Sequence, residues 1–385
     1  MAIDSQNIVS RYLQRRVLLL SLVLLALLFV ITASLARSYH ARETGLAAEW
    51  QQTGNTDLAK GKPGLAIDDF RNSLSYGPDD PEVQMRLAEA LLADGRYIES
   101  HSYLANLWDQ SPGSGPLNLD LARVSIQMGD VNQAIRFFHG AIFGSWDTNP
   151  ALERRKVRLE LCEFLLAHRR TNDAQAEIAG LAADTPSEDG PLREENGRLF
   201  LRAGEPVNAL TEFEAAIRIN PRQSQWLVEA AQVAFENGEY QKAETYFERS
   251  DRVSPSAAVH ASLLLVRDVL GNDPYMAGLS DDEQARRFWR DFKQGLDRLR
   301  DCAGSGMANL SSSSPAQDLQ QLTKDGQELQ KRLNPALLAR DPETRNEAMR
   351  FVFRVEDTTA KVCGPGTGFD QALKLIEARH EGSNS

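Results

Sequence analysis

The sequence predicts an all-α protein with three parts: an N-terminal transmembrane helix, a solenoid of about six helical hairpins plus an incomplete seventh, and a C-terminal helical bundle. Three observations lead to this prediction. An uncharged apolar segment covers residues 17–35, a motif recurs about every 34 residues from 47 to 257, and amphipathic patterns without that motif follow. The predicted parts are an N-terminal segment (1–16), the transmembrane helix (17–35), a juxtamembrane linker (36–46), the solenoid (47–271) and a C-terminal helical region (272–385).

The segment from Val17 to Leu35 contains no charge, proline or glycine. At about 1.5 Å per residue its 19 residues span roughly 28 Å, close to the thickness of the hydrocarbon core. A secretory signal peptide is the alternative, with a small-x-small cleavage pattern at Ser34 and Ala36. Because the apolar region of a signal peptide is only about 7 to 15 residues long, the length favours an uncleaved anchor.

The charges that flank this segment predict its orientation. Arg11, Arg15 and Arg16 precede it, whereas Arg37 and Arg42 follow it. The larger number of cations on the N-terminal side favours a cytoplasmic N-terminus. We therefore expect a single-pass protein of the inner (plasma) membrane, with the solenoid in the periplasm or another extracytoplasmic space.

Four columns define the repeat, and each keeps one type of residue at one offset. Successive closing positions lie 34, 34, 40, 35 and 34 residues apart, so the third and fourth copies are separated by an insertion. The glycine column is Gly61, Gly95, Gly129, Arg169, Gly204 and Gly238; the small column is Ala66, Ser100, Ala134, Ala174, Ala209 and Ala243; the large apolar column is Phe70, Leu104, Phe138, Ile178, Phe213 and Phe247; the closing column is Pro78, Pro112, Trp146, Pro186, Pro221 and Pro255.

These residue types suit two antiparallel helices, A and B. Glycine ends helix A in a left-handed conformation, and proline cannot continue helix B. The small residue of helix B allows helix A to approach, and the large apolar residue four positions later fills the space between units. A second small column lies in helix A: Gly54, Ala88, Ala122, Cys162, Gly197 and Ala231.

Trp50, Gly54, Gly61, Ala66, Phe70 and Pro78 together resemble the signature of the tetratricopeptide repeat (TPR) family. The resemblance covers residues 47–257 and implies a right-handed superhelix whose inner face, lined chiefly by helix A, binds peptides or proteins. Arg169, Trp146 and the insertion near residues 147–151 depart from the signature.

The inner face is predicted to carry an apolar column flanked by polar residues. An apolar stripe of this kind suits a partner helix or an extended hydrophobic segment. Glu89 and Asp120 would repel a terminal carboxylate. Alternatively, the same side chains pack helix A against helix A, or the C-terminal helices cover them. The apolar column is Leu58, Leu92, Ile126, Leu166, Leu201 and Phe235, and the neighbouring inner positions are Met85, Leu119, Leu159 and Val228.

Three cysteines occur in the chain. Cys162 stands in the small column of helix A, which predicts a buried structural thiol. Cys302 and Cys363 each follow a predicted helix and precede a glycine-containing turn, a position that favours a disulfide in an exported domain. Two separate thiols in a reducing compartment are the alternative.

Helical patterns continue beyond the repeats. Residues 257–271 resemble the first helix of a seventh unit that ends at Gly271, and Ser280 with Glu283 forms a capping box before an amphipathic helix that reaches residue 301. A Gly/Ser-rich linker is expected at residues 303–316. Further helices, predicted near residues 316–338, 342–362 and 368–379, should pack with the helix of residues 280–301.

The sequence contains no pattern typical of catalysis or of cofactor binding. The six histidines show no paired metal-ligand spacing, and no catalytic residue, metal site, cofactor or small-molecule substrate is predicted. The net charge of -11 and the interleaving of cations with carboxylates disfavour nucleic acid. These features predict a membrane-anchored scaffold, not an enzyme, that recruits partner proteins or peptides to an envelope assembly; the alternative is an accessory subunit that holds a substrate for an envelope enzyme or a secretion complex.

Overall fold

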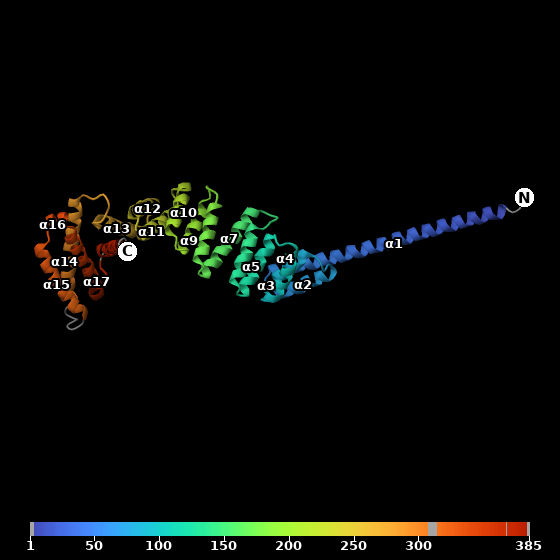
Figure 1. The fold of residues 1–385 in the computed structure, drawn as a ribbon, viewed down its shortest axis with the longest axis horizontal. Helices are drawn as coiled ribbons and strands as arrows, with labels where there is room; N and C mark the ends of the chain where they lie inside the picture. The colour runs from blue at the N-terminus through green and yellow to red at the C-terminus, as the bar shows by residue number, and fades with distance from the viewer. Residues whose placement is uncertain (1–3, 307–313, 367, 383–385) are drawn as a thin grey trace. The chain divides into compact units, whose positions relative to one another are not determined.

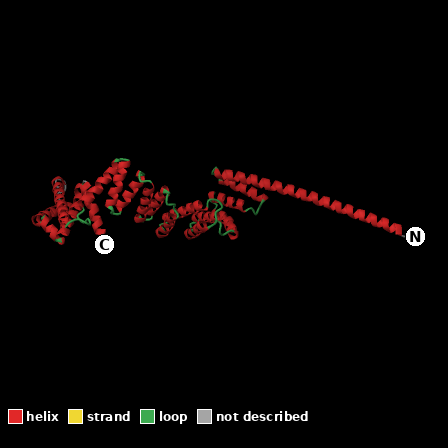
Figure 2. Ribbon diagram, turned by 90° about the horizontal axis from the view of Figure 1, so that it is seen from above, coloured by secondary structure: helices red, strands yellow, loops and turns green. Residues whose placement is uncertain are grey.

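The computed structural model describes residues 4–306, 314–366 and 368–382, and these residues contain helices and no strand (Figures 1 and 2). An isolated bridge joins Ser114 to Ser145. The helices form a TPR-like solenoid followed by further helices. Residues 1–164 and 165–385 make two compact units.

The first unit contains the hairpins of the first three repeats. The helices are α1 (Asp4–Ala59), α2 (Pro63–Tyr76), α3 (Pro81–Ala93), α4 (Tyr97–Gln110), α5 (Gly115–Gln127), α6 (Val131–Phe143) and most of α7 (Pro150–Ala167). Helix α1 pairs with α2, α3 with α4 and α5 with α6, while α2 packs on α3 and α4 packs on α5.

The second unit begins near the end of α7 and contains the remaining repeats and the C-terminal helices. Its helices are α8 (Thr171–Ala183), α9 (Gly190–Arg202), α10 (Pro206–Ile219), α11 (Ser224–Glu236), α12 (Tyr240–Val253), α13 (Ala257–Asn272), α14 (Asp281–Gly306), α15 (Ser314–Arg332), α16 (Pro335–Arg340), α17 (Pro342–Cys363) and α18 (Gly368–Gly382).

Helix α1 is continuous over 56 residues, so one helix contains both the apolar segment and helix A of the first repeat (Figure 1). Residues 36–46, which we predicted as a juxtamembrane linker, lie inside this helix. Helix α1 contains a candidate membrane span, and its apolar side chains between Leu24 and Leu35 are exposed.

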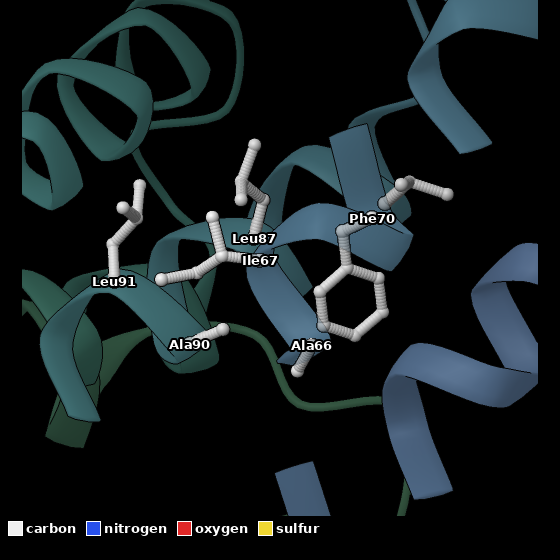
Figure 3. Close-up of a cluster of buried hydrophobic side chains, with 7 residues drawn as sticks. Ala66, Ile67, Phe70, Leu87, Ala90 and Leu91 are labelled. Atoms are coloured by element: carbon white, nitrogen blue, oxygen red, sulfur yellow. The ribbon is translucent and has the colours of Figure 1, made fainter. Parts of the chain in front are cut away.

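Aromatic residues of helix B rest on small residues of helix A. A Cβ atom at Gly54 would lie 2.8 Å from Cε1 of Phe70, and a Cβ atom at Gly197 would lie 2.8 Å from Cε1 of Phe213. Phe70 also belongs to a buried cluster that joins α2 to α3 of the next repeat (Figure 3). The cluster consists of Ala66, Ile67, Phe70, Val83, Leu87, Ala90 and Leu91. The large apolar column therefore fills the space between repeats.

The glycine column supplies the left-handed residue between helices A and B. The five glycines have φ between 69° and 80°. Arg169 occupies the same place in the fourth repeat and has φ of 56°. Its amide nitrogen donates to the carbonyl of Leu166 at 3.1 Å, and the glycines make the equivalent bond in their repeats. The fourth repeat thus keeps the turn geometry with a residue that disfavours it.

Trp146 replaces the closing proline of the third repeat through a different contact. Its indole nitrogen donates to the carbonyl of Ala141 at 2.9 Å, and its ring covers Gly115, where a Cβ atom would lie 2.3 Å from the indole. Ser145 exchanges backbone hydrogen bonds with Gly113 and Gly115 beside it. The ring and this short pairing close the repeat, and the inserted residues form the turn before α7.

The C-terminal helices α14 to α17 pack together, as predicted, whereas α18, which we expected to join α14, lies against α13 and α17. Three predicted boundaries are wrong. The segment 316–338 forms two helices, because Asn334 caps a new helix with a hydrogen bond from the amide of Leu337 and Pro335 begins it. Helix α13 runs past Gly271 to Asn272. Helix α14 reaches Gly306, so part of the predicted 303–316 linker is helical, and residues 307–313 lie outside the described residues.

Cys302 and Cys363 form a disulfide with a Cα to Cα distance of 5.8 Å. The bond joins α14 to the last residue of α17. Cys302 is buried, and Cys162 is completely buried in α7. The predictions for all three cysteines are confirmed.

We predict that Arg169→Gly stabilises the protein by about 0.5–1 kcal/mol, because glycine removes the steric cost of the left-handed conformation. Gly204→Ala, at the equivalent place in the next repeat, is the matched control and should destabilise it by a similar amount. Denaturant unfolding of the two variants in detergent measures both effects. Equal and opposite shifts are expected, and a loss of stability in Arg169→Gly would show that the arginine side chain contributes more than its backbone strain costs.

Candidate protein-interaction surface

The predicted inner-face residues of the first unit are half-buried. Leu58 on α1, Met85 and Leu92 on α3, Leu119 and Ile126 on α5, and Leu159 on α7 all belong to this class. Leu58 packs one side against the buried cluster of α2 and α3, and Met85 and Leu92 pack against a second cluster that includes Leu104 and Leu121. These side chains both support the repeats and expose part of their apolar surface.

Leu92 and Ile126 meet at a pocket of about 370 Å³. Arg123, Gln127 and Glu160 contribute its polar side, and Tyr97 from the first turn of α4 completes the lining. The structure therefore brings two members of the apolar column together. Tyr97, Gln127 and Glu160 were not predicted, since the search followed the apolar column and its nearest neighbours.

An ion pair between successive A helices borders this pocket. Arg123 on α5 donates from Nε to Oε1 of Glu160 at 3.0 Å and from Nη2 to Oε2 at 2.9 Å. Both side chains are partly exposed. An exposed pair of this kind adds little to folding stability, although two parallel hydrogen bonds fix the orientation of the guanidinium.

The predicted residues of the second unit have similar exposure. Leu166 near the end of α7 and Val228 and Phe235 on α11 are half-buried. Leu201 on α9 is 36% exposed, whereas Leu199 on the same helix is 3% exposed. Leu199 therefore lies in the core and Leu201, two residues later on α9, lies on the surface.

The second unit repeats the bordering ion pair. Arg198 on α9 donates from Nε to Oε1 of Glu229 on α11 at 3.1 Å, and it also pairs with Glu194. Arg198 stands at the same repeat offset as Arg123, and Glu229 stands at the same offset as Glu160. This shared offset is a sequence signal that could have predicted the pairing. In both units the apolar column lies beside an arginine whose charge is already matched.

Asp120 does not line the inner face, contrary to our expectation that it would repel a carboxylate there. It is 6% exposed, and its Oδ2 has no hydrogen-bond partner. Burial raises the pKa of Asp120 to about 7, with Glu89 adding to the rise and Arg123 opposing it. Glu89 is half-buried and pairs with Arg86 at 2.8 Å. Near neutral pH the Asp120 carboxyl is therefore partly protonated, and the local negative charge is lower than the sequence indicates.

No group of three or more His, Cys, Asp or Glu side chains that could hold a metal ion occurs among the residues that the structure describes. The described side chains on the helix-A side offer apolar contact, hydrogen bonding and paired charge.

Comparison with known proteins identifies the repeats. Two models of the tetratricopeptide repeat match the sequence, one over residues 91–142 and the other over residues 52–114 and 195–258. No curated protein sequence matches significantly. Residues 52–142 and 195–258 therefore contain tetratricopeptide repeats.

Solved structures with a similar arrangement are also repeat proteins. The C-terminal part of a TPR repeat-containing protein from Cytophaga hutchinsonii aligns with 62% of this chain and 92% of its own, at 14% identity and a TM-score of 0.41. PilF of Pseudomonas aeruginosa aligns with 58% of this chain and 98% of its own, at 14% identity and a TM-score of 0.38. YrrB, described as a TPR protein with an unusual peptide-binding site, aligns with 49% and 94%, at 13% identity and a TM-score of 0.35.

The raised pKa of Asp120 predicts a pH dependence of stability. Between about pH 4 and pH 7 the folded protein holds a proton that the unfolded chain has lost, so stability falls as the pH rises through this window. The Asp120→Asn variant has no carboxyl group to ionise at this position, so it does not lose stability in this pH window. We expect the variant to exceed the native protein by about 2–4 kcal/mol at pH 8 and to match it near pH 4. Thermal unfolding at both pH values measures the difference, and a gain that is the same at both would assign the effect to packing.

Proposed function

We propose that this protein is a membrane-anchored scaffold that binds a protein or peptide partner on the helix-A face and recruits it to an envelope assembly. The helix-A face comprises Leu58, Met85, Leu92, Leu119, Ile126, Leu159, Leu166, Leu201, Val228 and Phe235. The single observation that supports the proposal best is the pocket at Leu92 and Ile126, where apolar side chains of two adjacent repeats remain accessible beside a fixed ion pair.

The chemistry of this face favours a partner with an apolar stripe. Arg123 and Arg198 already pair with glutamates, so they offer hydrogen-bonding edges more than uncompensated charge. A partner gains affinity by covering the leucine and isoleucine side chains, and it gains specificity by matching the polar border. An amphipathic helix or an extended apolar segment meets both requirements.

The anchor determines where such a partner would be recruited. Exposed apolar side chains between Leu24 and Leu35 match the bilayer interior, and α1 continues from them into the first repeat without a break. This continuity supports a repeat domain held next to the membrane.

The extracytoplasmic orientation is part of the proposal. The excess of arginine before the apolar segment supports it, and so does the disulfide between Cys302 and Cys363, since disulfides persist in oxidising compartments. The proposed location is the inner (plasma) membrane, with the repeats in the periplasm.

Replacing Ile126 and Leu201 by Glu should abolish partner capture while leaving the fold intact, because both side chains keep exposed surface on which a carboxylate remains hydrated. The measurement compares proteins cross-linked to the native chain and to the variant in host membranes, together with the melting temperature of each.

The matched control replaces the buried neighbours Val124 and Leu199 by Glu. This change buries unpaired carboxylates and should cost several kcal/mol, which lowers the melting temperature sharply. If the surface variant melts as early as this control, the column is core; if it stays folded and still captures the same partner, the binding site lies elsewhere.

A separate experiment tests whether the apolar segment of α1 anchors the protein in the membrane. The full chain should remain in the membrane fraction through high-salt and carbonate washes, because the apolar length of α1 matches the hydrocarbon core. Deleting residues 1–35 should release the protein. N-terminal sequencing of the mature chain is the decisive control, since a start near Arg37 would establish a cleaved signal peptide instead.

A further inference from the structure

The arginines beside the apolar column are each shared by more than one carboxylate. In the first unit, Arg123 donates two hydrogen bonds to Glu160, and its Nη1 lies 3.8 Å from Oδ1 of Asp120. Its hydrogen bonds to Glu160, together with the negative charges of Asp120 and Glu89, raise the pKa of Arg123. Arg123 therefore neutralises only part of the negative charge around it.

The charges of this cluster do not balance when every carboxyl is ionised. Arg86 is its second cation and pairs with Glu89 at 2.8 Å. The charged groups that face Asp120 are Arg123 on its own helix, Arg86 and Glu89 on α3, and Glu160 on α7. Among these described groups, three carboxylates meet two guanidinium groups, so the cluster keeps one negative charge in excess.

The second unit shows a similar imbalance. Arg198 donates to Oε1 of Glu229 from Nε at 3.1 Å and from Nη2 at 2.5 Å, and it pairs with Glu194 at 2.5 Å. Glu194 also accepts from the indole nitrogen of Trp226 at 2.6 Å and from the amide of Gln225 at 3.0 Å, but these donors are neutral. Two carboxylates thus share one guanidinium group in the ion pairs described for this region.

The excess charge can be reached from the surface. The Glu160 side chain is 35% exposed and lines the pocket beside Leu92 and Ile126. The side chains of Glu229 and Glu194 keep a smaller exposed surface. A cationic group that enters beside the pocket can therefore approach the Glu160 carboxylate from solvent.

Asp120 adds to this charge from a buried position. No hydrogen-bond donor meets its Oδ2 among the described residues. When ionised, it is balanced only through the charges around it, and Arg123 lies nearer to Glu160 than to Asp120. A further cation beside the pocket would stabilise the ionised form.

These charges favour one kind of partner. An acidic segment would meet like charge, and a segment with apolar side chains alone would desolvate the excess carboxylate without replacing its water. A segment in which lysine or arginine borders the apolar side chains covers the leucine and isoleucine and also neutralises the excess charge.

We propose that the partner of the helix-A face is a basic amphipathic segment, which places an apolar side chain in the pocket at Leu92 and Ile126 and a lysine or arginine against Glu160. In the second unit, Glu194 and Glu229 accept an equivalent cation. This rests on the function proposed above, because it names the chemistry of the partner that the same face binds.

Binding of such a partner should depend on pH. Burial raises the pKa of Asp120 to about 7, so this carboxyl is largely protonated at about pH 6 and largely ionised at about pH 8. The excess negative charge of the first unit is therefore present only on the alkaline side of this range. A peptide whose lysines and arginines stay charged throughout should bind more tightly as the pH rises, because its charge favours the ionised carboxyl.

Selection from a random peptide library identifies the preferred charge without assuming it. The full chain in nanodiscs of neutral phospholipid is the bait, and the variant with Ile126→Glu and Leu201→Glu is used to remove peptides that bind elsewhere. This counter-selection also removes peptides held by charge alone, since the variant is more acidic. We expect the retained peptides to carry apolar residues bordered by lysine or arginine, with fewer acidic than basic residues.

The retained peptides without histidine are synthesised, and their affinity for each chain is measured by fluorescence anisotropy. Glu160→Gln should weaken their binding by about threefold to tenfold at about pH 8. Glu99→Gln is the matched control and should leave the affinity unchanged, because Glu99 also pairs with two arginines but lies on α4, a B helix. Asp120→Asn should remove the difference between about pH 6 and about pH 8.

The same peptides with glutamine in place of each lysine and arginine test the charge on the native chain, so the result does not depend on the stability of a variant. Weaker binding of these peptides and of Glu160→Gln, with unchanged binding of Glu99→Gln, supports the proposal. Retained peptides that are neutral or acidic, or that bind equally well after the glutamine replacement, would overturn it and leave the scaffold function in place. If no peptide distinguishes the native chain from the Ile126→Glu and Leu201→Glu variant, the proposed function fails and this inference fails with it.

Discussion

The solenoid depends on the contact between a large residue of helix B and a small residue of helix A. Where the small residue is glycine, as at Gly54 and Gly197, the aromatic ring lies within 3 Å of the position that a Cβ atom would take. The ring then reaches across to the next repeat, as Phe70 does in the cluster of α2 and α3. Each repeat thus buries its apolar face only when its neighbour is present, which makes the stability of the array a property of its interfaces.

This arrangement leaves part of helix A free for another task. Its core side meets helix B, and its other side carries the apolar column with half-buried side chains. Arginine and glutamate from successive A helices pair beside this column, as Arg123 does with Glu160 and Arg198 with Glu229. The pairs contribute little to folding, but they fix polar groups beside accessible leucines and isoleucines. The proposed binding surface therefore consists of side chains whose other side supports the repeats.

The two irregular repeats show which features the architecture requires. Arg169 adopts the left-handed conformation that glycine adopts elsewhere, so the turn geometry outweighs the preference of the residue. Trp146 closes the third repeat by covering Gly115 and donating a hydrogen bond, so proline is one of several ways to end helix B. The backbone path is conserved between repeats, whereas the residue that secures it varies.

The sequence by itself determined the parts of this protein that rest on local spacing. The period of the columns, the left-handed turns and the buried Cys162 all follow from contacts within one or two repeats, where helical geometry leaves few alternatives. The helix boundary at Asn334 was missed although its cap is local, because the apolar pattern continues across it.

Only the tertiary structure decided which charges meet and which side chains stay accessible. Arg123 and Glu160 are 37 residues apart, and only the repeat offset that they share with Arg198 and Glu229 relates them. Asp273 and Arg379 are 106 residues apart, and no local pattern pairs them. The exposure of Leu201 beside a buried Leu199 depends on what packs against α9, and the burial of Asp120 depends on the repeats around it. The docking of α18 on α13 likewise requires the path of the whole C-terminal region. Charge and exposure are set by neighbours that are distant in sequence, and for this reason the fold was predictable from its repeats while the detail of its surfaces was not.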